Sequence, residues 1–341
     1  MKDSMRKLLV TGGAGFIGSN FIRYWLQAHP EDTIVNLDVL TYAGNLENLK
    51  ECGSNPQYHF VKGDICDAEL VNSLMTDATH VVHFAAESHV DRSIVNPGAF
   101  VQTNVMGTLI LLQAAVAQKI SHFHHISTDE VFGSLPLGTD AKFTDSTAYD
   151  PRSPYAASKA GSDHLVRAYG ETFGLPFTLT NCSNNYGEYQ FPEKLIPLAI
   201  TNCIDNKPIP VYGDGLNIRD WLYVQDHCTA IDAVLTKGAL GKTYLVGGML
   251  KDVPNIEIAQ MIIHAFGKDQ SMIQFVADRP GHDRKYSVDW STIHTELGWQ
   301  PSVTLEEGLQ KTITWYTQHE EWWRPLLTKN KQYFETQYNS R

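Results

Sequence analysis

The sequence predicts an α/β protein built on a doubly wound parallel β-sheet, with a smaller α/β lobe in its C-terminal half. Three observations predict this class. Up to about residue 182, short apolar runs alternate with longer segments of helical period. A glycine-rich loop joins the first apolar run to the first helical segment. Beyond that stretch, prolines and glycines cluster and break the alternation, which indicates a differently built second unit.

The first half supplies six strands and three clear helices. The strands are expected at Leu8–Val10, Ile34–Leu37, Tyr58–Val61, Val81–Phe84, Phe123–Ile126 and Phe177–Leu179. The helices are expected at Phe16–Gln27, Asn104–Gln118 and Ala156–Phe173. Such alternation indicates a parallel sheet covered on both faces, because a parallel crossover needs about a dozen residues or more.

The second half is expected to rejoin the sheet once and then to complete the smaller lobe. Gln225–Lys237 has helical period, and Thr243–Val246 is a β-rich run. Leu305–Trp323 predicts an amphipathic helix rich in aromatic residues. We therefore expect a first domain over residues 1–182 with a return segment at about 220–246, and a lobe over 183–219 and 247–341.

Composition excludes several classes of function. Hydrophobic residues make up 43% of the 341 and charged residues 19%, which is typical of a globular chain with a sizeable core. The net charge of −11 argues against a general binder of nucleic acid or anionic membranes. The five cysteines form no C-x-x-C pair, so no zinc site or disulfide framework is expected and a reduced cytoplasmic setting fits. We expect no signal peptide, and no apolar run near the ~20 residues of a membrane helix.

The glycine loop predicts a Rossmann-type dinucleotide site. Gly12, Gly15 and Gly18, with Phe16 and Ile17 between them, follow a strand and open a helix, where a pyrophosphate meets the positive helix end. Asp38 ends the next strand, and a carboxylate there accepts hydrogen bonds from ribose hydroxyls and repels a 2′-phosphate. This favours NAD over NADP. The alternative is an ordinary strand–helix turn.

Residues after later strands are expected to line the same trough, because ligands collect at the carboxyl ends of parallel strands. They are Asp64, Ile65, Ala85, Ala86 and Ser88. Further cofactor contacts are expected from Leu40, Thr41, Thr103 and Asn185. Taken singly, each of the five residues that follow strands, from Asp64 to Ser88, is equally a turn residue.

A tyrosine and a lysine stand four apart at the start of a helix. Tyr155 and Lys159 therefore share one helical face. An ammonium beside a phenol favours the phenolate and lowers the tyrosine pKa, so Tyr155 is a candidate base for an alcohol that loses hydride. The alternative is a surface pair at helical spacing.

The fifth strand ends in a threonine and two adjacent carboxyls, Thr128, Asp129 and Glu130. The hydroxyl is placed to polarise the alcohol that Tyr155 deprotonates. One carboxylate beside another has its pKa raised, so one group of the pair can serve as an acid and the other as a base. The alternative, favoured by composition alone, is a solvated turn.

Motifs along nearly the whole chain resemble the extended short-chain dehydrogenase/reductase family, and within it most closely the dTDP-glucose 4,6-dehydratases. They lie at 12–18, 41–45, 85–93, 127–133, 155–159, 181–187, 191–197, 217–224 and 279–284. The Thr-Asp-Glu triplet discriminates, because the related sugar-nucleotide epimerases lack the acid pair.

The resemblance implies roles for these residues. Tyr155 deprotonates the C4 hydroxyl of a nucleotide hexose while NAD takes the C4 hydride, Glu130 removes the C5 proton, and Asp129 protonates the departing C6 hydroxyl. The hydride returns to C6, which gives a 4-keto-6-deoxy sugar without a metal. The first domain then binds NAD and the lobe the nucleotide sugar. The implied sugar-nucleotide contacts are Ser88, Thr128, Asn184, Lys194, Leu195, Pro210, Tyr212, Arg219, Asn255, Arg279 and His282.

The same resemblance implies a homodimer and leaves alternatives open. Phe132 and Glu188 stand where the family usually has tyrosine and proline, and the loop 245–255 is one residue longer than usual, which affects the assignment of Asn255. The nucleotide base or sugar preference can therefore differ, with UDP-glucose as the other substrate considered. A 4-epimerase and a non-enzymatic NAD-binding regulator are the competing functions, and neither uses the acid pair.

Overall fold

Seven parallel strands form one central sheet in the computed structural model, which describes residues 5–249 and 251–330. Their order across the sheet is β10-β6-β5-β4-β1-β2-β3. The strands are β1 (Lys7–Thr11), β2 (Thr33–Asp38), β3 (Tyr58–Lys62), β4 (His80–His83), β5 (His122–Thr128), β6 (Phe177–Cys182) and β10 (Lys242–Val246). The predicted fold class is confirmed, and each predicted strand is present within a few residues of its expected bounds.

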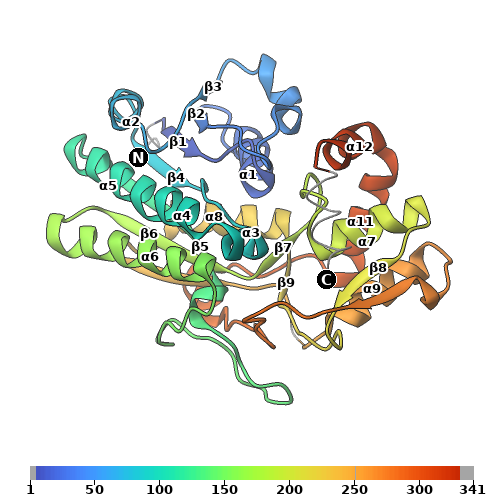
Figure 1. Cartoon of the computed structure of the whole chain (residues 1–341). Helices are drawn as coiled ribbons and strands as arrows, with labels where there is room; N and C mark the ends of the chain where they lie inside the picture. The colour runs from blue at the N-terminus through green and yellow to red at the C-terminus, as the bar shows by residue number, and fades with distance from the viewer. Residues whose placement is uncertain (1–4, 250, 331–341) are drawn as a thin grey trace.

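Two layers of helices cover the sheet because successive strand residues point to opposite faces. Leu8 and Val10 pack with α1 and α8 in one core, whereas Leu9 packs with α2, α5 and α6 in another. Figure 1 shows α5 and α6 along one side of the sheet. The helices are α1 (Phe16–Ala28), α2 (Ala68–Met75), α3 (Val90–Val95), α4 (Pro97–Phe100), α5 (Thr108–Ala117), α6 (Pro154–Phe173) and α8 (Val224–Lys237).

The helix expected to begin at Asn104 begins instead at Pro97. Pro97 suits a first helical position, and a π-helical turn, η2 (Val101–Gly107), joins α4 to α5. The resulting stretch Pro97–Ala117 has 21 residues and is apolar enough to cross a membrane by length and composition, which corrects our expectation that no run is long enough. It packs against α2 and α6, as core helices of the same composition do.

The C-terminal elements form a separate layer to one side of the sheet (Figure 1). Their apolar core joins α7, α9, α11 and α12 through side chains such as Ile200, Ile262 and Tyr316. The strands are β7 (Asn184–Tyr186) paired with β9 (Trp221–Tyr223), and β8 (Ile209–Tyr212) paired with β11 (Ile273–Val276). The helices are α7 (Leu195–Asp205), α9 (Asn255–Ala265), α11 (Leu305–Gln318) and α12 (Glu320–Lys329). Helix α10 (Ser291–Leu297) instead packs against β10 and α8 of the central sheet. Two parts of the predicted second unit, Leu250 and residues 331–341, lie outside the described residues.

The single helix expected over Leu305–Trp323 is wrong. Two helices occupy this stretch, and His319 separates them with non-helical backbone angles of φ −124° and ψ 46°. The break lets Trp323 turn back and bury its ring completely, with the indole N–H donating to the Tyr316 carbonyl at 2.9 Å. Because the Trp323 indole is buried, the amphipathic sequence pattern continues past His319 although the helix ends before it.

Candidate active site

A cavity of about 480 Å³ lies where the carboxyl ends of the sheet strands meet the C-terminal layer. Its wall includes residues after β1, β2, β4 and β5 together with residues of α7, β8 and the 279–286 loop. Every predicted site residue except Leu40 and Asp129 lies on this wall. Residues more than two hundred positions apart in the sequence therefore share one site.

The glycine loop makes one end of the cavity. Gly12 has a φ of +72°, and a side chain there would come within 2.5 Å of the Ala85 backbone nitrogen. A side chain on Gly18 would come within 2.5 Å of the Gly12 carbonyl. Helix α1 starts at Phe16 without a side-chain cap and without acidic residues in its first turn. Its free N–H groups and positive end suit an anionic group such as a pyrophosphate.

Asp38 stands beside this loop. One carboxylate oxygen accepts from the Ala14 N–H at 2.9 Å and the other from the Leu40 N–H at 2.8 Å. Burial raises the pKa of Asp38. Leu40 is not on the cavity wall, which corrects its assignment: its backbone, at a φ of +58°, turns to hold the carboxylate.

Tyr155 and Lys159 lie near the start of α6, whose first turn is capped by the Ser153 hydroxyl and begins with Pro154. Both side chains are buried and both reach the cavity, so the surface-pair alternative is wrong. The Lys159 ammonium donates to the Ile126 carbonyl at 2.8 Å.

The predicted lowering of the Tyr155 pKa is wrong. Burial raises the pKa of Tyr155 well above its usual value, and the charge of Glu130 adds to this, while a hydrogen bond with Thr128 opposes it. The surroundings of Tyr155 therefore favour the protonated phenol. Additional positive charge near the ring is needed before the phenolate can form and act as a base.

Asp129 is buried and Glu130 is half-buried. Thr128 caps a short 3₁₀ helix, η3 (Asp129–Phe132), by accepting from the Glu130 N–H at 3.2 Å. Glu130 lies on the cavity wall, where burial raises its pKa against the charges of Arg279, Lys194 and Arg219. The solvated-turn alternative is therefore wrong.

Asp129 lies behind this wall, which differs from its expected place beside the substrate. It is 1% exposed, and its Oδ2 atom has no hydrogen-bond partner among the described residues. Burial, then the charges of Glu130 and Asp220, raise the pKa of Asp129 well above its usual value. Such a shift favours the protonated form of the carboxyl, which can donate a proton.

Two predicted arginines face the far end of the cavity. Arg219 is buried, donates to the Ile218 and Asp283 carbonyls at 2.8 and 3.0 Å, and lies 4.3 Å over the Tyr286 ring. The Nε atom of Arg279 is buried without a partner among the described residues. Fixed guanidinium groups of this kind suit the phosphates of a nucleotide.

Tyr212 and His282 meet edge to face, with ring centroids 5.9 Å apart. Burial, helped by the charges of Arg279 and Arg219, lowers the pKa of His282 to about 3, so the ring is neutral. Asn255 begins α9 and also reaches the wall, with a buried carbonyl oxygen that has no partner among the described residues. The longer loop before it therefore still delivers this amide to the cavity.

Several wall residues were not predicted as site residues. Two of them are Tyr42 and Glu193, and Tyr42 donates to Glu193 at 3.0 Å. The guanidinium of Arg92, which is not on the wall, lies 3.7 Å over the Tyr42 ring. Each lies inside a motif that carried the resemblance, at 41–45, 191–197 and 85–93. The motifs signalled importance, but only folding shows that these three side chains meet.

The two departures from the usual family pattern have local partners. Phe132 packs between Phe143 and Tyr149, with centroids 5.2 and 5.1 Å away, so no hydroxyl is needed there. Glu188 accepts a 2.6 Å hydrogen bond from the Tyr223 hydroxyl. Neither residue lies on the cavity wall.

A glycine loop, a buried Tyr/Lys pair and a glutamate lie on one cavity wall with an aspartate behind it, which is the arrangement expected for the extended short-chain dehydrogenase/reductase family. Comparison with known proteins shows which group within this family the chain resembles. The family model for GDP-mannose 4,6-dehydratase matches residues 9–312. A dTDP-glucose 4,6-dehydratase of Neisseria meningitidis is 50% identical, with 95% of this chain and 96% of the relative covered.

Solved structures agree with the sequence relatives. DesIV, a dTDP-glucose 4,6-dehydratase of Streptomyces venezuelae with NAD and dTDP bound, has a TM-score of 0.91 and 48% identity over 94% of this chain and 99% of that one. A UDP-glucose 4-epimerase of Thermotoga maritima has a TM-score of 0.84 and 25% identity over 92% and 99%. The chain belongs to the extended short-chain dehydrogenase/reductase family, in the group of nucleotide-sugar 4,6-dehydratases.

Proposed function

We propose that the protein catalyses the NAD-dependent dehydration of a nucleotide hexose, dTDP-glucose to dTDP-4-keto-6-deoxyglucose. The observation that carries this proposal is the acid pair at the end of β5, with Glu130 on the cavity wall that Tyr155 also lines and Asp129 buried behind it. Burial raises the pKa values of both carboxyls. The charges of Glu130 and Asp220 add to the rise for Asp129, whereas the cations Arg279, Lys194 and Arg219 oppose it for Glu130. Elimination of water needs one group that removes a proton and another that supplies one, and a 4-epimerase needs neither.

The residues around the glycine loop fit NAD. The uncapped start of α1 would hold the pyrophosphate and Asp38 the adenosine ribose, with Tyr155 and Lys159 beside the nicotinamide ribose. When bound, NAD accepts a hydride from C4 of the sugar and later returns it to C6.

The protein groups move the protons. Tyr155, polarised by Thr128, takes the proton of the C4 hydroxyl. The C4 ketone acidifies the C5 hydrogen, which Glu130 removes as the base on the cavity wall. Asp129, whose pKa burial raises, lies one residue away in the same 3₁₀ turn and supplies the proton with which the C6 hydroxyl leaves as water. As the hydride arrives at C6, Glu130 gives a proton back to C5.

The proposed reaction is tested by incubating the purified protein with dTDP-, UDP-, CDP- and GDP-hexoses. Mass spectrometry should detect a product 18 mass units lighter, about one water, and the dTDP-hexose should react fastest. If only the UDP sugar loses water, the substrate carries uracil and not thymine. If the configuration at C4 inverts without loss of water, the protein is a 4-epimerase and not a dehydratase.

Asp38→Ala should weaken NAD binding by about 1–3 kcal/mol, because the variant loses a carboxylate that accepts ribose hydroxyls. Isothermal titration of the variant and of the unmodified protein with NAD and with NADP measures the effect. The thermal melting curve of the variant checks that the loop held through Ala14 and Leu40 is still folded. Equal affinities of the unmodified protein for NAD and NADP would contradict the role of Asp38.

The 94–106 segment supports a homodimer. Val95 is 81% exposed and Val101 51% exposed, with Ile94 and Met106 beside them in the sequence at 37% and 41%. Adjacent exposed apolar side chains of this size indicate an interaction surface. We expect light scattering to give twice the 38.2 kDa chain mass, and Val101→Glu to shift the protein to monomer.

We also propose a cytoplasmic setting and the two-unit division. All five cysteines are free, which fits a reducing compartment. The division assigns NAD to residues 1–182 with the return at about 220–246, and the nucleotide sugar to 183–219 and 247–341.

A further inference from the structure

A second buried carboxylate stands behind the Tyr/Lys pair. Tyr155, Lys159 and Asp163 are spaced by four along α6 and therefore follow one face of the helix. Asp163 is fully buried, does not line the cavity and has no part in the proton transfers above. The groups around its carboxylate indicate the role of the negative charge.

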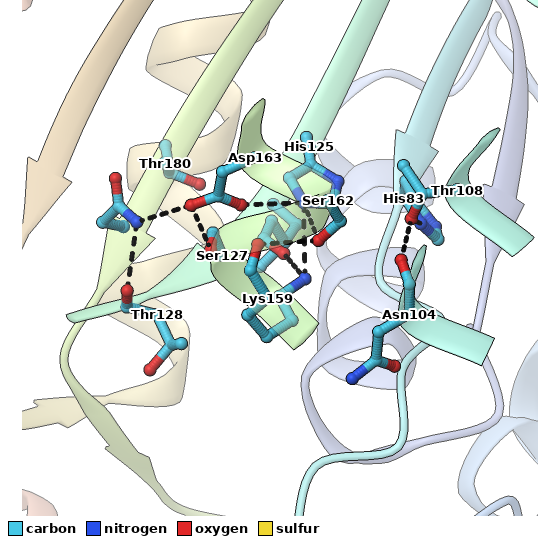
Figure 2. Close-up of polar contacts among 12 residues, drawn as sticks. His83, Asn104, Thr108, His125, Ser127, Thr128, Lys159, Ser162, Asp163 and Thr180 are labelled. Carbon is cyan, nitrogen blue, oxygen red and sulfur yellow. Dashed lines mark hydrogen bonds and ion pairs between the residues drawn. The ribbon is translucent and has the colours of Figure 1, made fainter. Parts of the chain in front are cut away.

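The His125 ring lies between Asp163 and Lys159 (Figure 2). Its Nε2 atom is 3.1 Å from Asp163 Oδ1 and 3.4 Å from Lys159 Nζ. The side chains of His125 and Asp163 are both 0% exposed. The ammonium is fixed from its other side by the Ile126 carbonyl at 2.8 Å. Lysine, histidine and aspartate thus form a continuous buried row.

Three donors hold Asp163 in this orientation. Its Oδ2 atom accepts from the hydroxyls of Ser127 and Tyr149, both at 2.8 Å, and from the Asn181 amide at 3.3 Å. Although burial raises the pKa of Asp163, the His125 contact, the charge of Lys159 and the Ser127 hydrogen bond bring it below its usual value. The carboxyl is therefore an anion.

The other titratable groups in this region are neutral or positive. Burial lowers the pKa of His125 to about 4, and the neighbouring His83 ring, 5.1 Å away, is also held neutral by burial. Burial raises the pKa of Cys182, which faces Lys159 from β6, to about 12, so this group is a thiol. The Arg167 guanidinium donates to Tyr149 at 2.9 Å. Asp163 is thus the anion that balances Lys159.

We propose that Asp163 is a positioning residue of the reaction: its negative charge, which acts on Lys159 across the neutral His125 ring, keeps Lys159 protonated and held against β5. This inference rests on the proposed function, in which Lys159 must be a cation for the Tyr155 phenolate to form. Burial disfavours the ammonium, and Asp163 offsets that cost. Without it, Lys159 loses its proton at a lower pH, and the phenolate loses its partner.

The test is the pH dependence of kcat for Asp163→Asn with the dTDP-hexose and NAD. The alkaline limb should move to lower pH by about 1–2 units, the size of the interaction of one unit charge roughly 6–12 Å away at an effective dielectric constant of ~20. KM should stay within about threefold, because Asp163 does not touch the cavity. An alkaline limb that coincides with that of the unmodified protein would overturn the proposal.

Two control variants separate charge from packing. Tyr149→Phe deletes one donor to Asp163 but keeps the carboxylate, so its alkaline limb should not move. Asp226→Asn changes another buried carboxylate, on α8, which is held by Ser302 and Val303 at 2.6 and 3.0 Å away from the cavity. It should lower the melting temperature without moving the limb. A shift in either control as large as that of Asp163→Asn would show a packing effect and overturn the proposal.

Folding gives an independent readout. Asp163→Asn leaves a buried ammonium unbalanced, so it should lower the melting temperature, and adding Lys159→Met should restore part of that loss. If Asp163→Asn alone does not fold, the double variant should. A double variant as unstable as the sum of the two single changes would overturn the charge pairing. Absence of dehydration by the unmodified protein would instead reject the proposed function, and this folding result would still stand.

Discussion

Glu130→Gln is expected to lower the rate of water loss by about 10²–10⁴-fold, the usual contribution of a general base. The glutamine amide keeps the size of the side chain on the cavity wall but cannot take the C5 proton. Oxidation at C4 does not require this proton, so a 4-keto-hexose and the absorbance of reduced nicotinamide should accumulate in the variant. Full activity after this change would remove Glu130 from the mechanism.

A solvent label sharpens the same prediction. In D₂O, product made by the unmodified protein should carry deuterium at C5 if Glu130 exchanges its proton with solvent. Mass spectrometry and proton NMR of the product locate the label. Asp129→Asn is the matched comparison: it should slow departure of the C6 hydroxyl by a similar factor while still permitting C5 exchange. Water loss without any label at C5 would contradict the role of Glu130 even though the fold is right.

Tyr155→Phe is expected to cost about 10²–10⁴-fold in kcat while NAD and nucleotide-sugar binding stay near normal. Burial and Glu130 raise the pKa of Tyr155, so the phenolate is hard to form, and we expect its formation to depend on the Lys159 ammonium and on Thr128. Phenylalanine keeps the ring packing and removes only the hydroxyl.

Single-turnover kinetics with a nucleotide sugar labelled at the C4 hydrogen would show whether the defect of Tyr155→Phe lies in the first step, oxidation at C4. Val166→Ala, on the same helix but packed into the sheet core, is a control for damage to α6, and it should lower stability with little change in the C4 step. Near-normal turnover of Tyr155→Phe would assign the base to another group.

The sequence predicted the strands, the glycine loop and the Tyr/Lys helix because each depends on neighbours a few positions away. An apolar run such as Leu8–Val10 is a buried strand almost independently of its partners, and helical spacing puts Tyr155 and Lys159 on one face. The same locality explains a failure: the aromatic pattern through Trp323 is helical in period, yet His319 breaks the helix so that the indole can be buried.

The motif residues of the site were identified from resemblance, but their burial and their pKa shifts were not predicted correctly. Adjacent sequence positions gave Asp129 and Glu130 as a pair, and folding put Glu130 on the cavity wall and Asp129 behind it. The tyrosine pKa was expected to fall because lysine is near, whereas burial raised it. Both outcomes depend on solvent exposure, which is a property of the packed chain.

The sequence by itself determined the parallel sheet, the NAD-type loop with Asp38, and the identity of the groups that can move protons. These follow from local backbone preferences and from side-chain chemistry. Only the tertiary structure decided which of these groups meet. Tyr42 reaches Glu193 across 151 positions, and His125 on β5 comes between Lys159 and Asp163 on α6. Such contacts are fixed by how strands and helices pack, and the burial they impose sets the charge of each group.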